Sequence, residues 1–379
     1  MVLTFQEWTQ SLQDEDISPY LDVVLQAYLE PHYYHECHLP KVFSWSYYIL
    51  FEIYSKHIIL MYNIGMAINV KELRTVFMGT PEISAGLLRT LLENKFNIVA
   101  VIAQPDKPVG RKNILQKVPT KVVAEEFNIP VYQPIKIRKD YEFLKEINPD
   151  LILTFAYGQI VPEGVLNIPK YGCLNFHGSL LPKYRGAAPI QFSLINNEKV
   201  TGVTLMEMIK EMDAGKMYAS KEVVIEDYDN STSLFKKIEA ASCELALEKL
   251  QDYIDGKLPG KEQDVSKVTF CPTIKPEEEK INLDLTAKEI WGWIRGLSDE
   301  PGAFLYLNNL KIKIFKALLI DDNSTGEPGE IIKADKSGFV FQTKCGCISI
   351  LELQKEGKSR MDYKSFLNGN QGLLGKKFN

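Results

Sequence analysis

An asparagine and a histidine stand two residues apart in the stretch 173–186, which reads CLNFHGSLLPKYRG. Side chains spaced by two lie on one face of a β-strand, so Asn175 and His177 would point the same way at a strand end. An amide N–H can stabilise an oxyanion, and an imidazole can relay a proton or stabilise charge as imidazolium. The pair therefore suggests acyl transfer, with a structural hydrogen-bonding histidine as the ordinary alternative. A covalent acyl-enzyme is not indicated, because no Ser or Cys stands in an elbow motif.

An aspartate follows in the stretch EMDAGKMY, which ends at residue 218. Asp-Ala-Gly after a predicted strand is a turn composition. Asp213 could orient His177 and stabilise its charged form. As a turn residue Asp213 needs no chemical role, and the residues alone leave both interpretations open.

The region 74–255 alternates short apolar runs with helical patterns. Thr80 is expected to cap the first helix, with Pro81 in its first turn. The alternation predicts a Rossmann-like α/β fold, with a mostly parallel sheet and helices on both faces. Open sheets of this kind bind ligands at the carboxyl ends of their strands, which is where Asn175 and His177 would lie. The runs predicted as strands are 75–79, 97–104, 129–134, 150–158, 172–177 and 201–208.

The C-terminal part of the chain has a different pattern. Residues 256–282 are rich in proline and charge and are predicted to be a linker. Beyond them, an Asn-Asn pair at 308–309 separates two apolar runs, as in a hairpin turn. Lys311 and Lys313 alternate with isoleucines, which gives one basic and one apolar face. We therefore expect 283–379 to form a small antiparallel β-barrel, similar to an OB fold.

Residues 1–65 differ from the rest of the chain, with eight Asp or Glu against two Lys. The run 47–69 is apolar, but it contains Glu52 and Lys56. A charge near the centre of a membrane span costs roughly 2.5 kcal/mol or more. We expect a buried or partner-facing helix, with a membrane span as the weaker option and Met66 as an alternative start. The role of 1–65 is unknown.

The scattered cysteines favour a cytosolic protein with reduced thiols over a disulfide framework. The net charge is −5, and the six cysteines are scattered without a Cys-x-x-Cys pair. No cleavable signal peptide is visible. The glycine turn FMGTPE lacks Gly-x-Gly-x-x-Gly, which counts against a dehydrogenase. The spacing HYYHECH is loosely permissive for zinc but is no recognised signature. Its candidate ligands are His32, His35, Glu36, Cys37 and His38.

Five motifs occur in order: VFMGTPEIS, QPDKPVGR, NFHGSLLPKYRGAAPIQ, TGVTLMEM and EMDAGKM. With them the chain resembles the methionyl-tRNA formyltransferases, within the wider family of 10-formyltetrahydrofolate-dependent formyltransferases. The resemblance covers roughly residues 74–379, about four fifths of the chain. The loop 104–121, which is rich in Lys and Arg, and the predicted C-terminal barrel favour the tRNA members of the family over the nucleotide and sugar members.

The resemblance implies a catalytic trio of Asn175, His177 and Asp213. The methionyl amine would attack the formyl carbon of 10-formyltetrahydrofolate, and Asn175 would hold the oxyanion. His177 would stabilise that charge or relay a proton to N10, while Asp213 would fix the ring and help remove the amine proton. No metal is required by this chemistry. The implied folate residues are Ser179, Leu180, Leu181 and Pro182, with backbone from 155–162.

The loop 104–121 carries five cations against Asp106. A solvated surface loop is the ordinary interpretation of such a charge run. The resemblance implies that the loop enters the acceptor arm of initiator methionyl-tRNA, with Arg111 at its tip and Lys112 in support. A basic face with Lys311 and Lys313 would contact the tRNA farther along. The cations of the loop are Lys107, Arg111, Lys112, Lys117 and Lys121.

Three alternatives remain at this point. A formyltransferase acting on an amino-sugar nucleotide would be indifferent to Arg111. A formyltetrahydrofolate hydrolase would release formate without tRNA. A tRNA-binding protein that has lost catalysis would keep its affinity for tRNA after loss of His177. For the methionyl-tRNA formyltransferase assignment we expect a monomer without membrane association.

Overall fold

The computed structural model describes residues 68–109, 114–321 and 323–379. The extension 1–65, with its apolar run and the candidate zinc ligands at 32–38, lies outside the described residues, as do Arg111 and Lys112.

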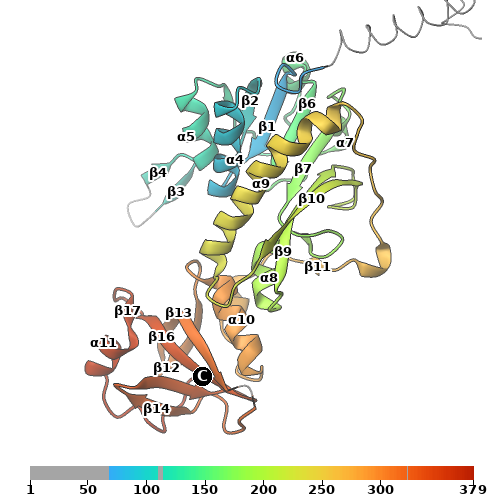
Figure 1. Cartoon of the computed structure of the whole chain (residues 1–379). Coiled ribbons are helices and arrows are strands. Elements are labelled where there is room, and N and C mark those ends of the chain that lie inside the picture. Colours follow the sequence, from blue (N-terminus) through green and yellow to red (C-terminus); the bar gives the residue numbers. More distant parts are fainter. Residues whose placement is uncertain (1–67, 110–113, 322) are drawn as a thin grey trace, which may run out of the picture. The chain divides into compact units, whose positions relative to one another are not determined.

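A seven-stranded sheet lies at the centre of the N-terminal part, in the order β10-β9-β7-β6-β1-β2-β5 (Figure 1). The five strands from β7 to β5 are parallel, whereas β9 runs antiparallel to β7, and β10 antiparallel to β9. The mostly parallel sheet is confirmed, but β10 was not predicted. The strands are β1 (Thr75–Gly79), β2 (Ile98–Ile102), β5 (Val131–Tyr132), β6 (Leu151–Phe155), β7 (Cys173–His177), β9 (Val200–Glu207) and β10 (Met217–Val224).

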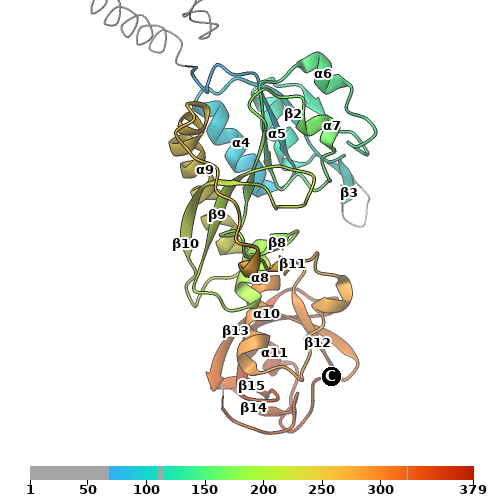
Figure 2. The ribbon, with the colours of Figure 1, turned by 90° about the vertical axis from the view of Figure 1, so that its right-hand side faces the viewer.

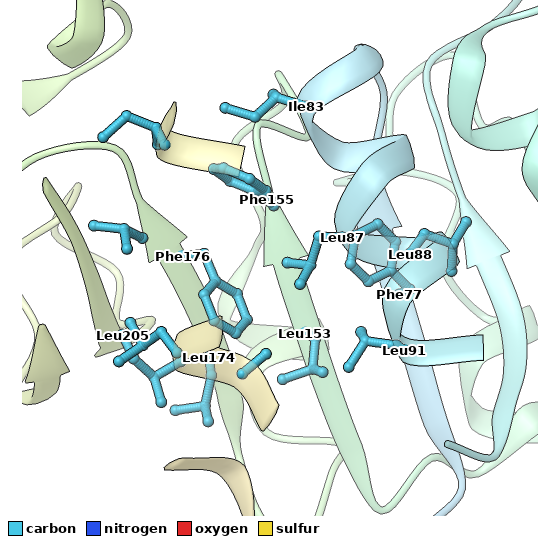
Figure 3. Packing of buried hydrophobic residues seen from close by; sticks show 14 of the residues in the cluster. Phe77, Ile83, Leu87, Leu88, Leu91, Leu153, Phe155, Leu174, Phe176 and Leu205 are labelled. Carbon is cyan, nitrogen blue, oxygen red and sulfur yellow. The ribbon is translucent and has the colours of Figure 1, made fainter. Parts of the chain in front are cut away.

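Helices cover both faces of this sheet (Figures 1 and 2). Alternate residues of β1 show why, since Phe77 packs in one apolar cluster while Val76 and Met78 pack in another on the opposite face. Figure 3 shows Leu87 and Leu91 lying toward the strands in the first cluster. On that side lie α4 (Glu82–Glu93), α5 (Pro119–Glu126) and α9 (Ser231–Ile254), and on the other lie α6 (Phe143–Ile147) and α7 (Glu163–Leu166).

Helix α9 has a side-chain cap at its start and a glycine just beyond its end. Asn230 caps it by accepting a hydrogen bond from the Ser233 N–H at 3.0 Å. Beyond its last turn Gly256 has a φ of 68°, a backbone conformation that glycine adopts without steric cost. By contrast, Thr80 does not cap α4. The N-cap is Pro81, and the Thr80 hydroxyl instead donates to the carbonyl of Tyr157 at 2.9 Å.

The C-terminal part is a small antiparallel β domain, in the order β12-β13-β16-β15-β14, with β17 beside β16. The last residues join its two edges, because Phe378 bridges Leu307 and Lys377 bridges Glu330. These bridges connect the edges as the predicted barrel requires. The elements are β12 (Ala303–Leu307), β13 (Leu310–Asp321), β14 (Ile331–Asp335), β15 (Gly338–Gln342), β16 (Cys347–Lys355), β17 (Met361–Asp362), α10 (Ala287–Leu297) and α11 (Tyr363–Asn368).

The alternation predicted along β13 is present. Ile312 and Ile314 are buried at 1% and 0% exposure, while Lys311 and Lys313 are half-buried on the other face. The Lys313 ammonium donates to the carbonyl of Pro301 at 2.6 Å. The Lys311 ammonium lies 3.6 Å from the ring centroid of Phe304. A role for these lysines in binding tRNA stays a prediction.

The segment predicted as a linker, 256–282, is packed against the part of the chain that forms the seven-stranded sheet. Its strand β11 (Phe270–Cys271) pairs in parallel with β8 (Arg185–Gly186), which lies in the loop after β7. The segment also contains two short 3-10 helices, η2 (Val265–Lys267) and η3 (Pro276–Glu279). The boundaries of the domains stay predictions.

No helix among the described residues is long and apolar enough to cross a membrane. Within that part of the chain, Cys173, Cys243, Cys271 and Cys347 are free thiols.

Candidate active site

The loop after β7 is held by bonds within itself and to β9. The Ser179 hydroxyl donates to the carbonyl of Lys183 at 2.6 Å. The Thr204 hydroxyl donates to the carbonyl of Ser179 at 2.7 Å and accepts from the Leu181 N–H at 3.2 Å. The Leu181–Pro182 peptide is cis. His177, the last residue of β7, therefore leads into a loop of defined shape.

Asn175 is oriented by the neighbouring strand. Thr154, on β6, is paired with Asn175 in the sheet, and its hydroxyl donates to the Asn175 Oδ1 atom at 2.8 Å. Because Oδ1 accepts this bond, the amide offers Nδ2 as a donor. Thr154 is buried, at 2% exposure, and nothing in the sequence marked it.

The ring of His177 is buried, at 4% exposure, and a backbone group fixes it. Its Nε2 atom lies 2.7 Å from the carbonyl oxygen of Tyr184. A carbonyl can only accept, so Nε2 carries a proton and the neutral ring has its lone pair on Nδ1. Nδ1 lies 3.7 Å from Oδ1 of Asp213, too far for a hydrogen bond but close enough for an ion pair once the ring is protonated.

Asp213 sits in the turn after β9, with a φ of 51°. Its Oδ2 atom accepts a hydrogen bond from the Gly186 N–H at 2.9 Å. Gly186 has a φ of 127°, and a Cβ there would lie 2.4 Å from the carbonyl oxygen of Cys271, so only glycine fits. The structure thus brings together the three residues that the sequence predicts, His177 with Asn175 by strand spacing and with Asp213 by contact.

The four predicted folate residues are in different environments. Ser179 is fully buried and its hydroxyl is bonded within the loop, and Leu181 is buried at 8% exposure. Leu180 and Pro182 line a pocket of about 430 Å³. Contact of these four residues with folate stays a prediction. The pocket is lined by Leu180, Pro182, Lys183, Tyr184, Glu198, Val200, Thr201 and Lys267.

The basic loop forms a hairpin of β3 (Lys107–Val109) and β4 (Ile114–Gln116). Two of its cations are paired within the protein, Lys117 with Glu125 and Lys121 with Asp106, each at 2.6 Å. Lys107 is exposed. Among Lys107, Lys117 and Lys121, the cations of the loop that the structure describes, two therefore carry a carboxylate partner.

The pair of Asp106 and Lys121 forms the base of this hairpin and is largely buried, at 12% and 20% exposure of the side chains. Gln133 and the Val118 N–H also donate to Asp106, at 2.8 Å and 3.2 Å. Burial by itself would raise the pKa of the Asp106 carboxyl. The hydrogen bonds from Lys121, Gln133 and Val118 outweigh burial and hold that pKa below its ordinary value of 3.8.

Polar side chains connect this base to the loop that follows β6. Gln133 donates to the carbonyl of Gln104 at 2.8 Å, and Gln104 donates through Nε2 to the carbonyl of Tyr157 at 3.3 Å. Gln159 in turn donates to Oε1 of Gln104 at 3.3 Å. The hairpin and the loop 155–162 are therefore joined by side chains that sequence analysis did not single out.

Within residues 68–109, 114–321 and 323–379, no three His, Cys, Asp or Glu side chains are grouped to hold a metal ion.

Two family descriptions match the chain. Formyl transferase matches residues 73–250, and Formyl transferase, C-terminal domain, matches residues 273–371. Among curated relatives, the methionyl-tRNA formyltransferase of Malacoplasma penetrans is 46% identical over 303 residues, 80% of this chain and 95% of the relative. That of Lactobacillus acidophilus is 44% identical, over 78% of this chain and 94% of the relative.

Solved structures share the fold at lower identity. An N-formyltransferase from Helicobacter canadensis, in complex with folinic acid and dTDP-3-aminofucose, is 23% identical with a TM-score of 0.56, over 75% of this chain and 99% of that chain. HypX from Aquifex aeolicus, in complex with tetrahydrofolic acid, is 18% identical with a TM-score of 0.54, over 78% of this chain but only 47% of HypX. Both likenesses concern the fold alone. With its two domain matches and curated relatives above 40% identity, the chain belongs to the formyl transferase family, among the methionyl-tRNA formyltransferases.

Proposed function

We propose that this protein transfers the formyl group of 10-formyltetrahydrofolate to the α-amino group of initiator methionyl-tRNA, for translation initiation. The observation that carries the proposal is that Asn175, His177 and Asp213 lie close together at the carboxyl end of β7. In a parallel sheet this edge is where ligands bind. The names of the curated relatives supply the substrate class.

Asn175 would act on the charge that develops during transfer. The amine nitrogen forms a bond to the formyl carbon, and the formyl oxygen becomes an oxyanion. The Nδ2 group of Asn175 donates to that oxygen, because Thr154 already occupies Oδ1. One preorganised donor of this kind is worth about 10²–10³ in rate.

His177 and Asp213 would carry the proton. With Nε2 donating to Tyr184, the Nδ1 atom of His177 is the ring position that can accept the proton lost by the amine. Asp213, 3.7 Å from Nδ1, stabilises the imidazolium that forms. The same proton then passes to N10 of the folate as the carbon–N10 bond breaks, so that no net proton is gained or lost on the protein.

The tRNA would be held by the basic hairpin. Lys107 is exposed on its first strand, and Arg111 and Lys112 complete the charge in the sequence. A monomeric, cytoplasmic enzyme that needs no metal remains our expectation. Gel filtration with light scattering tests the first point, and activity after exhaustive chelation tests the last.

The decisive experiment measures transfer of labelled formyl from 10-formyltetrahydrofolate to methionyl-tRNA. It uses the full chain and a version that begins at Met66. Formylation by both supports the function and shows that the extension is dispensable for catalysis. Formate release without tRNA would instead make the protein a hydrolase, and formylation of an amino-sugar nucleotide in place of tRNA would also overturn the proposal.

A further inference from the structure

A segment predicted as a linker runs along the active-site loop. We call residues 261–271 the strap. It bonds to three positions of the loop, because the Tyr184 N–H donates to the Thr269 hydroxyl at 2.9 Å and the Arg185 N–H to the Thr269 carbonyl at 2.9 Å. The Ala187 N–H then donates to the carbonyl of Cys271, also at 2.9 Å. The loop that carries the partner of His177 is therefore shaped by the strap.

One strap residue reaches a second structure as well. Gln263 is buried, at 7% exposure, and its amide donates to the carbonyls of Asp213 and Gly215 at 2.9 Å and 2.8 Å. Its Oε1 atom accepts a hydrogen bond from Nε of Arg185 at 2.9 Å. A single side chain thus joins the turn that carries Asp213 to the loop that carries Arg185.

The turn that carries Asp213 needs support from residues outside it. Asp213 has a φ of 51°, which is uncommon for a residue other than glycine. Its separation of 3.7 Å from His177 depends on where that turn sits relative to the loop. Gln263 fixes the position of the turn relative to the loop. It does so through the backbone carbonyl of Asp213, so the carboxylate of Asp213 is left to interact with Gly186 and His177.

We propose that Gln263 is a positioning residue for the formyl transfer, which sets the distance between Asp213 and His177 by clamping the 213–215 turn to the loop after β7. The inference rests on the proposed function, since it assigns chemistry to that pair. It gives the strap a part in the active site, rather than that of a spacer between two domains.

The test compares two glutamine-to-methionine changes in the full chain. Gln342 is the matched control, because it too is buried, at 4% exposure, and donates to two backbone carbonyls, those of Thr343 and Gly346, at 3.0 Å. Both Gln263→Met and Gln342→Met should lower Tm. Only Gln263→Met should lower kcat, by about 10-fold to 100-fold, because small misplacements of reacting groups have effects of that size. The KM for tRNA should change little. Wild-type kcat in a folded Gln263→Met protein would overturn the proposal.

A double variant separates positioning from general loosening. If Gln263 acts through Asp213, then adding Gln263→Met to Asp213→Asn should lower kcat by less than twofold further. Effects that multiply in full would show that Gln263 acts by another route, and would overturn the inference.

A crystal structure of Gln263→Met gives a readout that does not depend on the reaction. The separation between Nδ1 of His177 and Oδ1 of Asp213 should exceed the 3.7 Å of the native chain, while the contact of His177 with Tyr184 persists. An unchanged pair would contradict the positioning role. Failure of the native enzyme to formylate methionyl-tRNA would remove the proposed function and leave this structural test intact.

Discussion

The Nε2 atom of His177 lies 2.7 Å from the carbonyl oxygen of Tyr184, and this contact determines which ring nitrogen can exchange a proton. The same carbonyl accepts a second, weaker bond from the thiol of Cys271 at 3.2 Å. A backbone group therefore orients the imidazole, and Asp213 is left to stabilise charge rather than to hold the ring. The sequence pattern had suggested both tasks for the aspartate.

His177→Ala should lower the turnover of formyl transfer by about 10²-fold or more, because proton transfer by a positioned imidazole contributes at least that much. Folding should survive, since the carbonyl of Tyr184 keeps the thiol of Cys271 as a donor. Single-turnover formylation with saturating folate and tRNA measures the loss, and circular dichroism checks the fold. Wild-type turnover in this variant would rule out the catalytic assignment.

Thr154→Val should lower kcat by about 10-fold without a comparable change in the KM for folate. Valine keeps the shape of threonine but cannot donate to Oδ1 of Asn175, so the amide loses the bond that fixes its orientation. Thr154→Ser keeps the hydroxyl donor and should retain most of the wild-type activity. Steady-state kinetics on the three proteins measure the effect.

Thr75→Val is the matched control for that change. Thr75 is fully buried at the start of β1, and its hydroxyl donates to the carbonyl of Leu73 at 3.3 Å. It stands at the end of the sheet opposite to the site, so kcat should not change. Equal losses in Thr75→Val and Thr154→Val would contradict the specific role of Thr154.

Local sequence patterns predicted those structural features that depend only on residues close together in the sequence. Spacing by two placed Asn175 and His177 on one face of a strand, and the alternation of Lys and Ile placed the isoleucines of β13 on its buried face. Thr154 could not be found in this way, because its role exists only once β6 lies beside β7. The strand β10 was missed for a related reason, since it is a half-exposed edge strand with mixed polar residues and no apolar run.

The composition of the strap likewise did not reveal a role that depends on contacts between distant segments. The proline and charge content of 256–282, the segment that contains the strap, is typical of a solvated linker, and nothing in it distinguishes Gln263 from any other glutamine. The residue matters because two carbonyls and an arginine converge on it in space. Such a contact involves three segments that are separate in the sequence. No one of these segments therefore carries a periodic sequence pattern that would reveal it.

Arg111→Ala should raise the KM for methionyl-tRNA and leave folate binding unchanged. Removal of one phosphate contact should also make the dependence of tRNA affinity on salt shallower, by about one unit in the log–log slope. Lys117→Ala is the control, because Glu125 already neutralises Lys117 at 2.6 Å. Filter binding across a salt series, together with formylation kinetics, distinguishes the two. An unchanged KM for tRNA in Arg111→Ala would remove the hairpin from the tRNA site.

Asp106→Asn should destabilise the protein in a manner that depends on pH. The pKa of Asp106 is held below its ordinary value of 3.8 in the folded state, so its charge stabilises the fold at pH values above that value. This contribution is lost as pH falls through the folded pKa. At pH 7 the variant should be less stable by about 1–3 kcal/mol, the usual range for a hydrogen-bonded charge. The difference from wild type should shrink as the pH is lowered below about 4.

Urea unfolding of both proteins at several pH values measures this prediction. Lys121→Met removes the other member of the pair, and the double variant should be less destabilised than the sum of the two single changes, because both remove the same 2.6 Å contact.

Since Asp106 and Lys121 form the base of the hairpin, Asp106→Asn should also raise the KM for tRNA while sparing folate. Equal destabilisation at neutral and acidic pH would show that the carboxylate charge is not what holds the hairpin in place.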